Sequence, residues 1–167
     1  FGKRVLVTRT RSQAGALSHL LMRRGALPIE LPTIEARPLD DYSRLDESLA
    51  HLDGYDWVIF TSVNAVRAVF ERLATLGLDA RAFGAAHVGA VGSTTAESLR
   101  GHGISPDYVP NAFQAEAMVS GLKSRGVSKG TSVLVPQADI ATETLRDGLT
   151  SLGATNDAVV AYRTVTP

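Results

Sequence analysis

The chain has 167 residues, of which 44% are hydrophobic, and by the usual scaling one domain of this length buries roughly 70% of its unfolded surface. Seventeen Lys and Arg balance seventeen Asp and Glu, so the composition excludes an overall positive field that would gather nucleic acid or a membrane surface. The chain has no cysteine and no apolar run near the about 20 residues of a membrane span, which excludes thiol chemistry and makes us expect a cytoplasmic protein.

Apolar runs typical of strands alternate with helical patterns along the whole chain. The expected strands cover residues 4–8, 28–31, 57–61, 86–91, 107–109, 132–136 and 157–163. The expected helices cover residues 13–24, 45–51, 65–76, 94–102, 115–123 and 140–152. This alternation predicts an α/β fold with a parallel sheet covered by helices.

An internal repeat indicates two similar α/β lobes. A shift of 128 positions lays Val5-Leu6-Val7 on Val133-Leu134-Val135 and Gly25-Ala26 on Gly153-Ala154, by duplication or by convergence on one βαβ pattern. Residues 32–39 are bracketed by prolines and suit a linker or edge strand, with which the end of the chain can pair. We therefore expect three parts. They are residues 1–35, the first part of lobe 1 with a linker strand; residues 36–160, a complete lobe 2; and residues 161–167, a returning linker strand.

Two predicted strands end in turns rich in hydroxyl groups. In the first turn, Ser62, Val63 and Asn64 follow the most hydrophobic strand and precede a helix. Free backbone N–H groups at a helix N-terminus, the helix dipole and short polar side chains together favour a carboxylate or phosphate. The alternative is simple N-capping, because Ser and Asn are favoured at helix starts.

The second turn repeats this arrangement with Gly92, Ser93 and Thr95. Gly92 allows close backbone approach to a ligand, and the hydroxyls follow in the first helical turn. The alternative is a capping box of Ser93 or Thr94 with Glu97. Neither turn matches a nucleotide-binding glycine motif, so the pair of turns predicts a small anionic ligand of another kind.

Three further residues are candidates for chemistry. Arg9 and Arg11 follow the first strand and could hold carboxylates, or could be solvated loop residues. Tyr162 ends the last strand, where its hydroxyl could donate a proton or fill a buried contact. The four histidines lack metal-binding spacing, so we expect no metal site.

Five segments, taken in order and spacing, resemble the uroporphyrinogen-III synthase family. They are residues 5–9, 55–66, 91–96, Pro110 with Ala115-Glu116, and 161–164. The resemblance implies two flavodoxin-like α/β lobes joined by a two-stranded linker, with only part of the first lobe in this chain. It also implies a monomeric lyase of haem biosynthesis that needs no cofactor. Its substrate is hydroxymethylbilane, a linear tetrapyrrole, which it closes with inversion of the last pyrrole ring and loss of water.

The resemblance also implies roles for single residues. Tyr162 matches the tyrosine suspected of assisting the departure of hydroxide. Ser62, Val63 and Asn64 match a turn that contacts the substrate largely through backbone groups, and Thr95 matches a hydroxyl that faces the cleft. The remaining residues expected to bind substrate are Arg9, Gly92 and Ser93.

Two departures from the family pattern leave an alternative open. Many relatives carry arginine where this chain has Gln137, and another arginine is replaced by Thr142. A non-catalytic or regulatory module that binds an anionic ligand is therefore the alternative to the enzyme. A sugar-binding or phosphate-binding α/β domain is a third hypothesis.

Overall fold

The computed structural model describes residues 1–112 and 114–167, with every side chain in those ranges except those of residues 11–13. The chain divides into two compact units. Unit 1 comprises Phe1–Arg37 and Arg163–Pro167, and unit 2 comprises Pro38–Tyr162. No helix within the described ranges is both long enough and apolar enough to cross a membrane.

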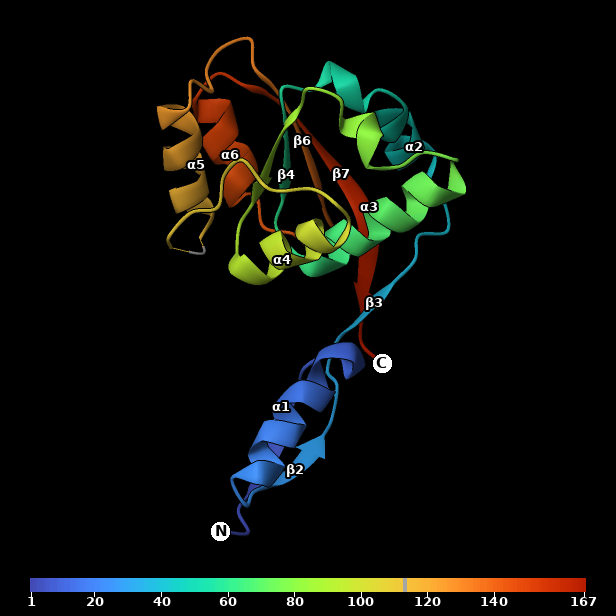
Figure 1. Ribbon diagram of the computed structural model, residues 1–167, viewed down its shortest axis with the longest axis vertical. Helices are drawn as coiled ribbons and strands as arrows, with labels where there is room; N and C mark the ends of the chain where they lie inside the picture. Colours follow the sequence, from blue (N-terminus) through green and yellow to red (C-terminus); the bar gives the residue numbers. More distant parts are fainter. Residues whose placement is uncertain (113) are drawn as a thin grey trace. The chain divides into compact units, whose positions relative to one another are not determined.

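Unit 1 consists of one βαβ segment and a short antiparallel ladder. β1 (Arg4–Val7) and β2 (Leu27–Glu30) pair in parallel, and α1 (Arg11–Arg23) packs against both strands (blue in Figure 1). β3 (Glu35–Arg37) pairs with the last residues of β7 (Thr155–Val165). This ladder confirms the pairing expected between the proline-bracketed segment and the end of the chain.

Unit 1 leaves large apolar side chains in contact with solvent. Leu6 of β1 and Ile29 of β2 lie opposite each other in the ladder and are 56% and 46% exposed. Leu20 of α1 and Leu31 after β2 are exposed to a similar degree. Two strands and one helix are too few to cover both faces of such a pair of strands.

Unit 2 contains the main sheet and five α-helices among its described residues. Its strands are β4 (Trp57–Phe60), β5 (His87–Ala90), β6 (Ser132–Ala138) and the first part of β7. Its α-helices are α2 (Ser43–Ala50), α3 (Val63–Thr75), α4 (Ser93–Gly101), α5 (Ala115–Ser124) and α6 (Thr144–Ser151). Short 3-10 helices cover Leu52–Gly54 and Ala80–Phe83.

The strands of unit 2 form a parallel sheet in the order β7-β6-β4-β5. A single bridge from Gly89 to Tyr108 extends the sheet beyond β5, and it is all that forms of the strand expected at residues 107–109. The α/β class with a parallel sheet is thus confirmed. With the Tyr108 bridge counted as a strand, the order across the sheet is Tyr108-β5-β4-β6-β7. Numbered along unit 2 alone this is 3-2-1-4-5, which differs from the order 2-1-3-4-5 of flavodoxin.

Alternation along the strands creates two apolar cores. Phe60 and Leu134 belong to the core under α2, α3 and α4, whereas Ile59 and Val133 belong to the core under α5 and α6. Figure 1 shows these two sets of helices on opposite faces of the sheet. Because both faces are covered, β4 is buried at every residue, as expected for a central parallel strand.

An ion pair joins two helices on one face of unit 2. Nε and Nη2 of Arg72 in α3 donate to the carboxylate of Asp46 in α2, the second at 2.6 Å, and the Arg72 guanidinium lies over the Tyr42 ring. The bonds from Arg72 lower the pKa of Asp46, against an opposing contribution from partial burial. The pair therefore couples the α2–α3 contact to the ionisation of Asp46.

Candidate active site

A pocket of about 250 Å³ lies at the carboxyl edge of the sheet in unit 2. α3 leads from β4 to β5 on one side of β4, whereas β6 pairs with the other side, so the order in which the parallel strands are added reverses between β4 and β6. Ligands of open α/β sheets bind at such reversal points. The pocket is lined by Thr61, Val91, Ala115, Gln137, Ala138, Ala141, Thr142, Leu145 and Tyr162.

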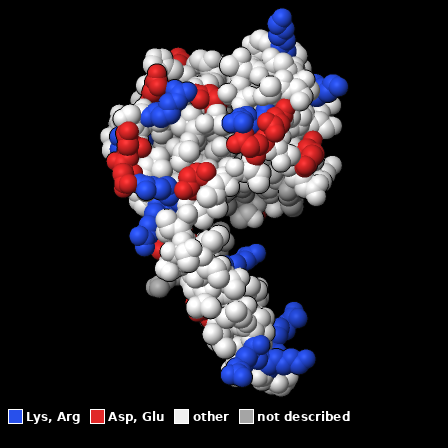
Figure 2. Space-filling model, turned by 180° about the vertical axis from the view of Figure 1, so that it is seen from behind, with Lys and Arg blue, Asp and Glu red and all other residues white. Residues whose placement is uncertain are grey.

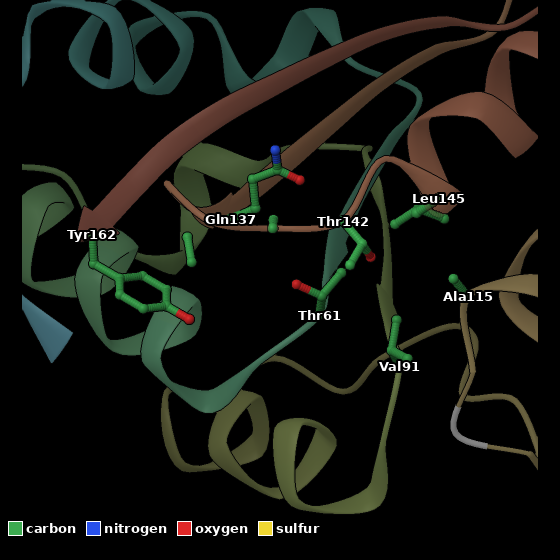
Figure 3. Close-up of a pocket in the computed structure, with 9 residues that line it drawn as sticks. Thr61, Val91, Ala115, Gln137, Thr142, Leu145 and Tyr162 are labelled. Atoms are coloured by element: carbon green, nitrogen blue, oxygen red, sulfur yellow. The ribbon is translucent and has the colours of Figure 1, made fainter. Parts of the chain in front are cut away.

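The lining combines neutral hydrogen-bonding groups with an apolar wall. In the view of Figure 3, Tyr162 lies on one side, Val91 and Leu145 lie on the other, and Thr61 and Thr142 lie between them. None of the nine lining residues carries a charge. Such a pocket can bind carboxylates through hydroxyl and backbone donors without a fixed cation.

A β-bulge places Tyr162 at this pocket. Gln137 of β6 pairs with Val160, but Ala138 pairs with Tyr162, so Ala161 is the extra residue on β7. Bulges redirect side chains near functional sites. The turn after β6 holds this geometry, because the backbone N–H of Asp139 donates to the carbonyl of Tyr162 at 3.2 Å.

Ser62 joins the N-terminus of α3 to the tyrosine. Its backbone is extended, with φ −153° and ψ 154°, and its Oγ accepts a hydrogen bond from the N–H of Ala65, so the capping role that the sequence indicates is confirmed. The same Oγ lies 3.1 Å from the hydroxyl oxygen of Tyr162. Val63 and Asn64 follow in the first turn of this 13-residue helix, where backbone N–H groups have no intrahelical acceptor.

The second hydroxyl turn is built differently. Gly92 is the N-cap of α4 and no side chain caps this helix, so the alternative interpretation of a capping box with Glu97 is wrong. Ser93 is exposed at the first helical position, whereas Thr95 is buried, with 5% of its surface exposed. Val91, just before this turn, lines the pocket, but Gly92, Ser93 and Thr95 are not among the lining residues.

The arginine candidates belong to unit 1. Arg9 is exposed in the bend that follows β1, and the side chain of Arg11 lies outside those that the structure describes. Thr61 lines the pocket, and the sequence places it with Ser62 and Asn64 as hydrogen-bonding side chains at the end of a hydrophobic strand. Leu145 also lines the pocket, and its only signal in the sequence is its position at the start of the apolar pattern of α6.

Charge is divided unequally between the units although the chain as a whole is neutral. Unit 1 carries eight Lys and Arg against two Asp and Glu, a net charge of +6, and unit 2 carries a net charge of −6. Figure 2 shows Lys and Arg predominating on the visible face of unit 1, while both signs are interspersed on unit 2. Lys3, Arg4, Arg23 and Arg24 are exposed cations of unit 1. The lining of the pocket therefore offers a ligand local hydrogen-bonding groups and no charged side chain.

Comparison with known proteins gives consistent results. A family model described as uroporphyrinogen-III synthase HemD matches residues 15–167. The chain is 34% identical to the porphyrin biosynthesis protein HemD of Ruminiclostridium josui over 98% of this chain and 32% of that protein. It is also 34% identical to the uroporphyrinogen-III synthase of Synechococcus elongatus, over 99% of this chain and 62% of that protein.

Solved structures share the fold at lower identity. A mutant uroporphyrinogen III synthase from the extremely thermophilic bacterium Thermus thermophilus superposes with a TM-score of 0.73 at 18% identity, covering 99% of this chain and 64% of that one. The uroporphyrinogen-III synthetase of Helicobacter pylori gives a TM-score of 0.55 at 18% identity, over 100% and 63% of the two chains. The chain thus spans from about a third to just under two thirds of these relatives.

Proposed function

The chain belongs to the uroporphyrinogen-III synthase family, and we propose that the protein closes hydroxymethylbilane into uroporphyrinogen III with inversion of the last pyrrole ring and loss of water. The observation that carries this proposal is the neutral pocket where the strand order reverses. There the hydroxyl oxygen of Tyr162 lies 3.1 Å from Ser62 Oγ, which caps α3. A proton donor beside a set of neutral anion-binding groups suits elimination of water from a polycarboxylate.

The proposed domain organisation follows the same family. Residues 36–160 form one complete lobe, residues 1–35 form the first part of another, and residues 161–167 return to it as a linker strand. Two observations support this. Unit 1 exposes Leu6 and Ile29 on a pair of strands that further chain would cover, and relatives such as the Synechococcus synthase are longer than this chain.

We assign substrate binding to the two helix N-termini and to one arginine. Around α3, the backbone of Ser62, Val63 and Asn64 provides N–H donors for carboxylates of the substrate, which has eight. Arg9 adds a charged donor. A few such contacts are enough to orient a flexible polyanion, because each carboxylate takes a directional hydrogen bond.

The N-terminus of α4 contributes the remaining donors. Gly92 permits close approach to the backbone, and exposed Ser93 adds a hydroxyl. Thr95 is buried, so its part is to hold the first turn of α4, and only a change in that turn would bring its hydroxyl to a ligand.

Tyr162 is the proposed acid. Its proton passes to the hydroxymethyl oxygen, the carbon–oxygen bond breaks, and its electron pair leaves with water. The substituted carbon of the last ring then attacks the methylene carbon to give a spiro intermediate, and rearrangement restores the pyrrole with release of one proton. The main task of the protein is to hold the linear tetrapyrrole in a conformation in which this carbon reacts before the unsubstituted position does.

The product isomer tests this function. Hydroxymethylbilane cyclises to the type I isomer unaided, so we expect addition of the intact protein to give the type III isomer, separated chromatographically after oxidation to the porphyrin. A product that remains type I contradicts the proposal, and binding without turnover would support a non-catalytic module. We further propose that the protein is a cytoplasmic monomer. Light scattering on the intact protein gives its mass in solution and so tests the monomeric state.

A further inference from the structure

We propose that the Ser62 side chain is a positioning residue that directs and stabilises the Tyr162 hydroxyl during proton transfer, in addition to capping α3. The inference rests on the proposed function and gives the Ser62 hydroxyl a role separate from the backbone contacts to substrate. The evidence is two distances measured from Ser62 Oγ. Ser62 Oγ lies 3.1 Å from the N–H nitrogen of Ala65 and 3.1 Å from the hydroxyl oxygen of Tyr162.

The valence of a hydroxyl group allows Ser62 to accept from Ala65 and to donate to Tyr162 at the same time. Ser62 Oγ has one proton and two lone pairs, and the N–H of Ala65 occupies one lone pair. The Ser62 proton is then available to the Tyr162 oxygen, which leaves the phenolic proton free to point into the pocket. Hydrogen bonds in such a chain strengthen one another, and this chain begins at the positive end of a 13-residue helix.

Proton transfer fixes that direction. When Tyr162 gives its proton to the leaving hydroxyl, the carbon–oxygen bond breaks, water departs and a phenolate remains. A phenolate only accepts hydrogen bonds, so Ser62 must then be the donor. The proton that the substrate releases when its pyrrole is restored returns to the phenolate, which balances the cycle.

The uncharged surroundings of Tyr162 make its contact with Ser62 important for stabilising a phenolate. Tyr162 is half-buried, its ring packs against the core under α3, and the nine residues lining its pocket bear no charge. No cation among them neutralises a phenolate. A charge-assisted bond from Ser62 therefore supplies stabilisation that solvent supplies elsewhere.

Two substitutions separate positioning from capping. Ser62→Gly keeps a favoured N-cap residue, so it costs the helix little stability, but it removes Oγ. Ser62→Thr keeps both the cap and the hydroxyl. In the intact protein we expect Ser62→Gly to lower kcat about 10-fold to 100-fold with KM changed less than about threefold, and Ser62→Thr to restore most of the rate.

A double-mutant cycle with Tyr162→Phe supplies the readout that a merely structural role would not give. Once the phenolic oxygen is gone, Ser62→Gly should change kcat by less than about twofold. Asp79→Gly is the control, because Asp79 caps a separate 3-10 helix by accepting from the N–H of Arg81. It should leave kcat unchanged in both backgrounds.

The outcomes distinguish the two proposals. If the intact wild-type protein yields no type III isomer, both the proposed function and this inference are overturned. If it yields the type III isomer but the effects of Ser62→Gly and Tyr162→Phe multiply independently, the function stands and the positioning role is refuted. Equal losses for Ser62→Gly and Ser62→Thr would also refute it, since the hydroxyl would then not matter.

Discussion

Gly148 allows α5 and α6 to pack closely beside the pocket, and its replacement by alanine is the sharpest stability test. A Cβ atom on Gly148 would lie 2.5 Å from Cγ2 of Val119 and 3.1 Å from Cγ1. Alanine gains about 1 kcal/mol in helix propensity, whereas overpacking of this kind costs about 1–3 kcal/mol. We therefore expect Gly148→Ala to destabilise the protein by about 1 kcal/mol, measured by denaturant unfolding of the intact protein.

A second substitution isolates the cause. Val119→Ala removes both clashing atoms, so in the Gly148→Ala background it should cost at least about 1 kcal/mol less than it costs alone. Gly101→Ala is the matched control within a helix, since a Cβ there meets nothing within 4 Å, and it should not destabilise. Additive effects, or a Gly148→Ala as harmless as Gly101→Ala, would refute the packing argument.

Three further predictions concern the site, the helix pair and the charge distribution. Tyr162→Phe should lower kcat about 100-fold and leave product affinity within about threefold, as measured by steady-state kinetics and product titration; normal turnover would remove this residue from the mechanism. Asp46→Asn should destabilise the protein near neutral pH, because the lowered pKa of Asp46 means that its ion pair with Arg72 stabilises the fold above the unfolded-state pKa. That contribution is lost as the pH falls through the folded-state pKa, so unfolding curves of variant and wild type should converge below about pH 4, and a constant gap would contradict the assignment. Raising the salt from about 0.05 to 0.5 M should increase KM several-fold with little change in kcat, and an unchanged KM would argue against long-range attraction of the substrate.

Local sequence patterns were sufficient for most of the fold. The alternation of apolar runs predicted the parallel sheet, and the prolines around residues 32–39 predicted the ladder formed by β3. The expected helix at 140–152 begins only at Thr144, because the preceding residues form a turn in which the Asp139 N–H donates to Tyr162. This hydrogen bond joins the end of β6 to β7, two segments far apart in the sequence, so local helix propensity cannot predict it.

The site was harder to predict for the same reason. The capping role of Ser62 follows from residue type, but its contact with Tyr162 joins positions 100 residues apart and depends on the order β7-β6-β4 and on a bulge at Ala161. Neither the order nor the bulge has a sequence signature of its own. The division of charge was equally hidden, since a balanced total says nothing about where a boundary falls.

Under the proposed function, the unequal charges assign different tasks to the two units. Unit 2 carries a net charge of −6, so at a distance it repels a polycarboxylate, and its pocket attracts one only where helix N-termini and hydroxyls are within hydrogen-bond reach. Unit 1, at +6, would attract such a polyanion over about a Debye length, in addition to the direct contact proposed for Arg9. Neutral substitutions of exposed cations such as Arg23 and Arg24 should therefore alter KM and its salt dependence. Loss of donors around α3 should instead alter kcat and the ratio of type III to type I product, because under the proposed function those donors orient the ring carbons relative to the reactive methylene.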